Sequence, residues 1–171
     1  MTALDTLHTI SLFVANKPGV LLRITVVFAR RGFNIESLVV SSAFDGRFSR
    51  MTITAKGEDR SLEQIVKQLS KLVDVIDARD STDAHALARE LALIKINIST
   101  KKRPELLQIV EHFKAKTIDL TDESMIIEVS GNSEKISAMI ALMDPFEVVE
   151  LIRSGKIVMQ RGIETGDDHG R

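Results

Sequence analysis

The chain has 171 residues and a formal net charge of −1, and it contains no cysteine, tryptophan or tyrosine. This length suits one domain or two small ones, and the balanced charge provides no basic face of the kind that nucleic acids require. No apolar run approaches the roughly 20 residues that cross a bilayer, and the N-terminus lacks the basic and apolar regions of a secretory signal. Disulfides and thiol chemistry are excluded, and we expect a cytoplasmic protein that binds neither nucleic acid nor membrane.

Apolar spacing predicts six elements in the first half of the chain. In chain order these are strand 8–15, helix 20–31, strand 34–42, strand 48–56, helix 61–72 and strand 73–80. A turn at Asp45-Gly46 joins the two middle strands as a hairpin. Ser61 and Gln64 have the spacing of a capping box, which predicts the start of the second helix. The predicted order is β-α-β-β-α-β.

The same order repeats after a polar, alanine-rich stretch, 81–89, which is predicted to be a linker. The repeated elements are strand 91–100, helix 104–114, strand 116–121, strand 125–130, helix 133–143 and strand 147–153. A short apolar piece, 156–160, follows, and the polar tail is predicted to be flexible. The predicted division is therefore a first domain 1–80, the linker 81–89, a second domain 90–161 and a tail 162–171.

Two such units predict an α+β protein made of two ferredoxin-like domains in tandem, each an antiparallel sheet with its helices on one face. The strand order of this topology is 4-1-3-2, which places strand 34–42 at an edge. We expect Ile35 and Val39 on one face of this strand and Leu38 and Val40 on the other. An edge that is apolar on both faces is unfavourable in water. We therefore predict a homodimer in which this strand pairs with its copy; the alternative is a lone domain whose helices or loops cover the edge.

The loop before the first helix is the strongest candidate for a ligand site, and it reads Asn16-Lys17-Pro18-Gly19-Val20-Leu21. The first N–H groups of a helix have no partner inside it, and the helix dipole adds partial positive charge there. Gly19 has no side chain that would keep a carboxylate away from these groups. The alternative is an ordinary strand-to-helix connection, in which Asn and Pro are common cap and first-turn residues.

The second half provides an internal comparison for this loop. Its equivalent loop has Glu105 where the first half has Gly19, so a carboxylate of the protein already meets the helix dipole there and would repel another. An acidic or zwitterionic ligand should therefore bind the first half. Asn34, at the start of the edge strand, offers an amide that can donate to a carboxylate and accept from an ammonium group. Its alternative role is a turn residue that bonds its own backbone.

The sequence shows no arrangement typical of catalysis or metal binding. The four histidines are not paired at helical spacing, and no nucleophile elbow, phosphate-binding loop or dinucleotide-binding motif is present. Asp74 and Asp77 are interpreted as scattered surface acids. We therefore expect no catalytic residue and no metal ligand in this chain.

Several segments spread over nearly the whole chain belong to one pattern: Asn16-x-Pro-Gly19-Val-Leu, Arg31-Gly32-Phe-Asn34-Ile-Glu36-Ser37-Leu, Ser49-Arg50-Met51-Thr52-Ile53, Arg89-Glu90-Leu91, Ile118-Asp119-Leu120-Thr121 and Arg153-Ser154-Gly155. Together they resemble the regulatory (small) subunit of acetohydroxyacid synthase, also called acetolactate synthase, with its ACT domain in the first half. The chain departs from the family pattern in the hairpin 43–47, which looks shorter, and at 113–116, where the family usually has Phe-Arg-Gly.

The resemblance implies a regulatory subunit with no catalytic activity of its own. Such a subunit activates a catalytic subunit that carries thiamine diphosphate, Mg²⁺ and FAD. It also makes that enzyme sensitive to feedback inhibition by valine, and in some members by leucine or isoleucine. By the family pattern, valine lies between two ACT domains and contacts Asn16, Gly19, Val20 and Leu21 of one chain and Asn34 and Ile35 of the other. The alternatives are a freestanding ACT-type sensor for another partner, a DNA-binding regulator and a self-contained enzyme.

Overall fold

The computed structural model describes residues 6–82 and 86–162, and the chain divides into two compact units. Unit 1 consists of the described residues up to Leu87 together with those from Lys156 onward, and unit 2 is Ala88–Gly155. The predicted flexible tail falls, from residue 163 onward, outside the described residues. No helix in the described ranges is long and apolar enough to span a membrane.

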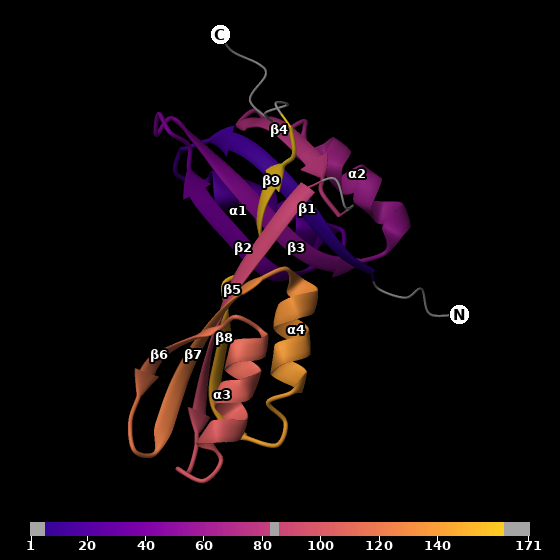
Figure 1. Cartoon of the computed structure of the whole chain (residues 1–171). Helices are drawn as coiled ribbons and strands as arrows, with labels where there is room; N and C mark the ends of the chain where they lie inside the picture. Colours follow the sequence, from indigo (N-terminus) through magenta and orange to yellow (C-terminus); the bar gives the residue numbers. More distant parts are fainter. Residues whose placement is uncertain (1–5, 83–85, 163–171) are drawn as a thin grey trace, which may run out of the picture. The chain divides into compact units, whose positions relative to one another are not determined.

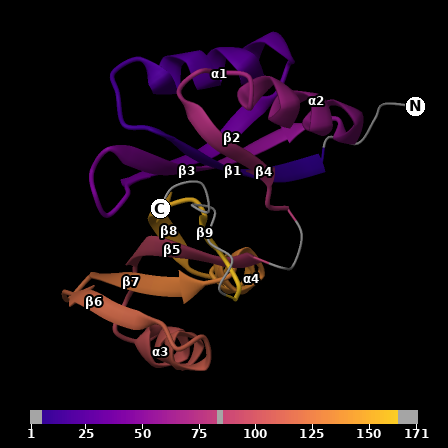
Figure 2. The same cartoon turned by 90° about the horizontal axis from the view of Figure 1, so that it is seen from above.

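Unit 1 is an antiparallel sheet with two helices on one face, as predicted. Its strands are β1 (Thr6–Ala15), β2 (Asn34–Ser42), β3 (Phe48–Gly57) and β4 (Val75–Asp80), and its helices are α1 (Val20–Arg30) and α2 (Asp59–Leu69). The strand order is β2-β3-β1-β4, which confirms the predicted 4-1-3-2 order and the edge position of β2. Both helices lie on the same side of the sheet (Figure 1, Figure 2).

The core of unit 1 lies between this sheet and its helices. Alternate residues of β1 face it, and Ile10 and Val14 are fully buried, as are Ile24 and Phe28 at a spacing of four on α1. A period of two on a strand and a spacing of four on a helix each place side chains on one face. These periods are the signals that predicted the elements, and they explain why the prediction was right.

The predicted start of α2 is wrong. The capping-box spacing placed Ser61 before the helix, but the N-cap residue is Glu58, without a side-chain cap bond. Ser61 lies inside the first turn, where its N–H donates to the Glu58 carbonyl (2.9 Å). The helix also ends at Leu69 rather than at residue 72. Val73, predicted as the first residue of the next strand, lies before β4 and is 95% exposed.

The predicted faces of β2 are also wrong, because the strand contains a β-bulge. The register with β3 shifts between Ile35 and Ser37, so Glu36 is an extra residue that reverses the alternation of side chains. As a result, Ile35 and Leu38 both pack against the core instead of facing opposite sides. Val40 follows on the core side and is 46% exposed.

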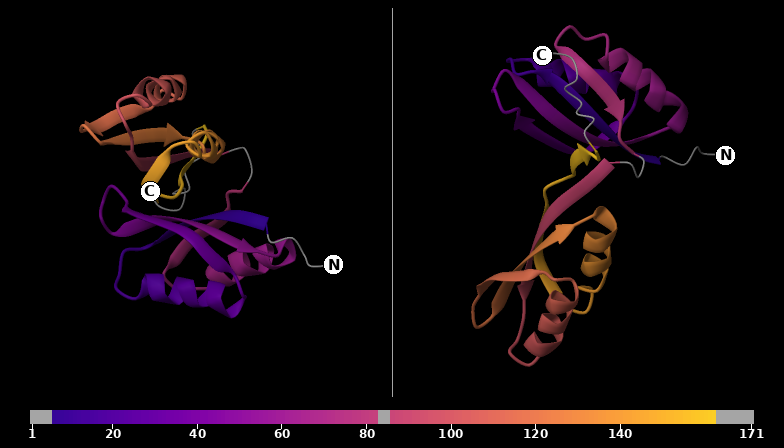
Figure 3. Two further views of the ribbon diagram at one scale, coloured as in Figure 1. Left: turned by 90° about the horizontal axis from the view of Figure 1, so that it is seen from below. Right: turned by 45° about the horizontal axis from the view of Figure 1, so that its top comes forward.

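Unit 2 repeats the same architecture with its own core. Its strands are β5 (Ala86–Asn97), β6 (Lys116–Leu120), β7 (Ser124–Gly131) and β8 (Glu147–Arg153), and its helices are α3 (Arg103–His112) and α4 (Ser133–Ala141). The strand order is β6-β7-β5-β8, again 4-1-3-2. Residues of both helices, Leu106 and Ile136, are fully buried in one cluster with Ile94 and Ile127 of the sheet. Figure 3 shows the two-layer arrangement of each unit from two further directions.

Two features of the chain's division differ from the expected one. β5 already begins at Ala86, so the last four residues of the stretch predicted as a linker, 86–89, form a strand. Burial alternates along this strand, but residues 86–88 are three consecutive apolar residues, so the sequence shows no period of two at its start. The short strand β9 (Ile157–Gln160) pairs with β5, and the residues from Lys156 group with unit 1.

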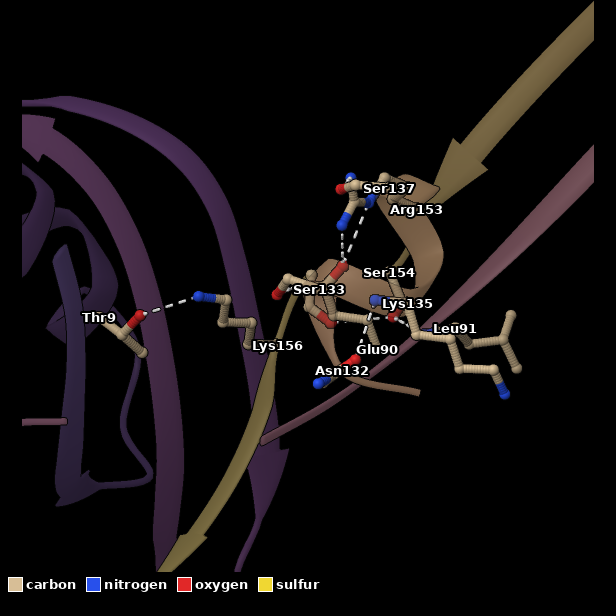
Figure 4. A network of polar contacts seen from close by, with 11 residues as sticks. Thr9, Glu90, Leu91, Asn132, Ser133, Lys135, Ser137, Arg153, Ser154 and Lys156 are labelled. Atoms are coloured by element: carbon tan, nitrogen blue, oxygen red, sulfur yellow. Dashed lines mark hydrogen bonds and ion pairs between the residues drawn. The ribbon is translucent and has the colours of Figure 1, made fainter. Parts of the chain in front are cut away.

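A buried carboxylate connects three elements of unit 2. Glu90 on β5 is 6% exposed, and it accepts hydrogen bonds from the Ser133 hydroxyl at the start of α4 and from Arg153 Nε (3.1 Å) on β8. Arg153 Nη1 also donates to the Ser137 hydroxyl (3.3 Å). Figure 4 shows these contacts. Two segments of the family pattern, around Glu90 and Arg153, thus meet in one network.

Candidate functional site

The first helix begins without any side-chain cap. Its N-cap residue is Gly19, which has φ +82° and ψ −8°, and the first turn contains no acidic residue. This left-handed conformation is unfavourable for residues with a β carbon, so the backbone itself selects glycine here. The N–H groups at the start of α1 and the positive end of its dipole are therefore not covered by a side chain of residue 19.

An arginine that sequence reasoning missed lies at this helix start. A β carbon placed on Gly19 would be 3.5 Å from Nη1 of Arg23. The guanidinium group also forms an ion pair with Asp74, which is only 9% exposed, so the interpretation of Asp74 as a surface acid is wrong. The available signal was the spacing of four, which places Arg23 on the same helix face as Gly19.

The other predicted residues of this loop take different positions. Asn16 does not cap α1: its Nδ2 donates to the Gly46 carbonyl (2.9 Å) in the β2–β3 hairpin. The Val20 side chain is buried in the core (2% exposed), whereas Leu21 is 39% exposed. Within this chain Val20 therefore presents only its backbone at the helix start, and Leu21 presents an apolar side chain.

Asn34 and Ile35 lie at the beginning of β2. Asn34 Nδ2 donates to Glu36 Oε1 (2.9 Å), so its amide bonds a neighbouring carboxylate. Lys56 Nζ lies 3.3 Å from the same oxygen. The bond from Asn34, followed by the hydrogen bond and charge of Lys56, holds the pKa of Glu36 below its usual range. Ile35 packs against the core from the sheet edge.

The two groups of predicted residues are not brought together within one chain. Asn34 pairs with Lys56 at one end of β3, whereas Ala15, which precedes the loop, pairs with Phe48 at the other end. At about 3.3 Å per residue, the eight steps from Phe48 to Lys56 separate these ends by about 26 Å. A site that uses both groups therefore needs a second chain.

The equivalent helix of unit 2 has a different start. α3 carries Glu105 in its first turn and proline at its beginning, and its N-cap residue, Lys102, has right-handed backbone angles. This confirms the expected contrast, because a carboxylate already lies at the dipole of α3 and none lies in the first turn of α1. Within the described ranges no group of three or more His, Cys, Asp or Glu side chains could hold a metal.

The βαββαβ fold of unit 1, with an open glycine start on its first helix, agrees with an ACT domain, a class of domain that implies allosteric regulation, and a family match assigns it to that class. Residues 10–77 match the family of ACT domains that resemble the one in the small subunit of acetohydroxyacid synthase (AHAS). Residues 89–162 match the family of the small subunit of acetolactate synthase. The chain therefore belongs to the family of acetolactate synthase small subunits.

Individual relatives agree with this assignment over almost their full length. A probable acetolactate synthase small subunit from Archaeoglobus fulgidus is 44% identical over 155 residues, which cover 91% of this chain and 97% of that protein. The acetolactate synthase small subunit from Mycobacterium bovis is also 44% identical over 155 residues, covering 91% and 92%. The crystal structure of the small subunit from Thermotoga maritima superposes with a TM-score of 0.81 at 39% identity, covering 92% of this chain and 98% of that one.

Proposed function

We propose that this chain activates a catalytic subunit of acetolactate synthase and makes it subject to feedback inhibition by valine. In this proposal the chain is not an enzyme, and thiamine diphosphate, Mg²⁺ and FAD belong to the catalytic subunit. The observation that carries the proposal is the helix start at Gly19, which lacks a covering side chain and an acidic residue in its first turn. The chemistry of this position suits recognition of a small carboxylate rather than its conversion.

Valine would bind with its carboxylate at the start of α1. The N–H groups and dipole of the helix attract the anion, and the guanidinium group of Arg23 lies close to Gly19. The exposed side chain of Leu21 offers an apolar contact for a branched side chain. The ammonium group needs an acceptor, which the carbonyl oxygen of an Asn34 amide would supply.

That Asn34 would come from a second copy of the chain. Antiparallel pairing of β2 with its copy about a two-fold axis sets the start of one β2 against the end of the other. The end of β2 leads into the hairpin that Asn16 contacts through Gly46. The pairing therefore brings Asn34 and Ile35 of one chain towards Gly19 of its partner. The separation of about 26 Å within one chain supports this shared site over a site in the monomer.

Inhibition would follow from the difference in valine affinity between two arrangements of the pair. A ligand shifts an equilibrium only by the difference in its affinities for the two states. Typical coupling free energies are about 1–3 kcal/mol, so we expect partial to strong inhibition. By reciprocity, the binding of the catalytic subunit changes the affinity for valine.

The decisive experiment assays acetolactate formation by the catalytic subunit with and without this chain, across added valine, leucine and isoleucine. We expect higher activity with the chain and valine inhibition only in its presence. Acetolactate formation by the chain alone would contradict the proposal. Valine binding without any effect on the catalytic subunit would favour a freestanding ACT-type sensor instead.

Asn34→Ala should weaken valine binding about fivefold and leave activation unchanged, because it removes one hydrogen-bonding side chain from the shared site. Isothermal titration calorimetry measures the affinity. Glu36→Gln serves as the control, since it weakens the contact between Asn34 and Glu36 without removing the amide. If Asn34→Ala abolished activation as well, Asn34 would support the dimer or the partner surface instead of the ligand.

Val40→Lys should dissociate the homodimer and abolish valine binding with it, because it places like charges along the β2 edge where two copies meet. Sedimentation equilibrium measures the oligomeric state. Ile118→Lys is the matched control: Ile118 is similarly exposed, at 51% against 46% for Val40, and lies on β6, the corresponding edge of unit 2. A monomeric Val40→Lys variant that bound valine normally would exclude a site shared between chains.

A further inference from the structure

A cavity of about 240 Å³ lies on the face of the unit 1 sheet that the helices leave uncovered. Its walls come from β1, β3 and β4 and from the C-terminal strand β9, which lies beside this face (Figure 2). Lys156, just before β9, donates from Nζ to the Thr9 hydroxyl on β1 (3.4 Å; Figure 4). The cavity is separate from the start of α1, because α1 packs on the other face.

The charged groups of the cavity favour an anion. Its lining contains two guanidinium groups, those of Arg50 and Arg79, and one carboxylate, that of Asp77. Arg79 Nε forms an ion pair with Asp77 (2.7 Å), which leaves the terminal nitrogens of this guanidinium group as further donors. The carboxylate is thus already paired with a cation, so it offers little attraction to the ammonium group of an amino acid.

Residues that pair across β3, β1 and β4 form rows perpendicular to the strands, and two neighbouring rows on this face line the cavity. Ser11 lies between Thr52 and Arg79, and its hydroxyl oxygen is shielded from solvent without a hydrogen-bond partner in the part of the chain that the structure describes. A buried polar group of this kind costs free energy unless something bonds it. In the next row Phe13 lies beside Arg50, whose guanidinium carbon is 5.4 Å from the ring centre.

We propose that this cavity binds a small aliphatic monocarboxylate at a site distinct from the amino-acid site at Gly19. Arg79 and the Ser11 hydroxyl bind the carboxylate, and Phe13 and Met159 of β9 contact the hydrocarbon chain. The volume of about 240 Å³ is below the range of about 300–1,000 Å³ typical of drug-sized ligands, so it suits a ligand of only a few carbons. The remaining donors of Arg79 and the Ser11 hydroxyl suit a single carboxylate.

The test titrates the intact chain with isovalerate, which has the carbon skeleton of valine without its ammonium group, and with neutral isovaleramide. Calorimetry measures affinity, and the NMR signal of the Met159 methyl group reports the location. We expect saturable binding of isovalerate that shifts this signal, and about tenfold weaker binding of isovaleramide. Arg79→Gln should weaken isovalerate binding about tenfold and Ser11→Ala about threefold. Arg47→Gln should leave binding unchanged, because Arg47 does not line the cavity and forms its ion pair with Asp45 in the β2–β3 hairpin.

Isovalerate and isovaleramide binding with equal affinity, or an unaffected Met159 signal, would overturn the proposal. So would an unchanged affinity in both Arg79→Gln and Ser11→Ala. Gly19→Asp separates this site from the proposed valine site, because isovalerate binding should survive that substitution. Displacement of isovalerate by valine would show that the carboxylate occupies the amino-acid site, and the separate cavity site would be rejected.

Discussion

Gly19→Asp should weaken valine binding at least tenfold, about 1.4 kcal/mol, while the fold and the activation of the catalytic subunit are retained. The new carboxylate would occupy the helix start and repel the carboxylate of the ligand. It would also lie beside Arg23, since a β carbon on Gly19 is 3.5 Å from Nη1, and would compete for that cation. Calorimetric titration with valine measures the effect.

The matched control is Gly19→Asn, which has nearly the same shape but no charge. Any side chain at this position must adopt φ +82°, and Asn and Asp tolerate this region better than most residues. The backbone strain is therefore similar in the two variants, and the difference between them isolates the charge. Unchanged valine affinity in Gly19→Asp would refute the assigned site. Equal losses in both variants would mean that shape rather than charge excludes valine.

Glu90→Ala should lower the free energy of unfolding of unit 2 by about 2–3 kcal/mol. Glu90 is buried, and its removal leaves Arg153 and Ser133 without the carboxylate that both contact. Loss of one partner of a buried ion pair is costly because the other charge remains uncompensated. The Arg153 side chain is 35% exposed, and water that reaches it brings the cost to or below the bottom of the usual range of about 3–5 kcal/mol. Chemical denaturation measures the change.

Glu63→Ala is the control for this prediction. Glu63 forms an ion pair with Lys67 (2.6 Å) on α2, but both side chains are more than 65% exposed, so solvent screens the pair and we expect no measurable loss of stability. Valine binding should persist in Glu90→Ala, because the helix start at Gly19 belongs to unit 1, which has a core of its own. Equal destabilisation by the two substitutions would contradict the structural role of Glu90.

Most of the fold could be predicted from local signals. The alternation along β1 and the spacing of four along α1 predicted both elements, since each period directly reports a buried face. The boundaries of β2 and β8 were predicted without error. The capping-box spacing of Ser61 and Gln64 gave a wrong start for α2, because the same spacing also occurs inside a helix, and the helix begins at Asp59.

The candidate site was predictable only in part. Gly19 could be found because its conformation and its place before a helix are local properties. The difference between the starts of α1 and α3, where Glu105 replaces the glycine, could be predicted for the same reason. The pairing of Arg23 with Asp74 joins residues 51 positions apart, and no local pattern encodes it. The assignment of Asn34 and Ile35 to a site shared between chains stays a prediction.

The sequence by itself determined the repeated βαββαβ order, the open start of α1 and the family, because each depends on residues close together along the chain or on their order. Only the tertiary structure decided which side chains meet. The bulge at Glu36 changed the faces of β2, and the return of the chain end placed Met159 over the outer face of the sheet beside Ser11 and Arg79. Contacts between distant segments depend on how whole elements pack, so the local periodicity of the sequence does not predict them.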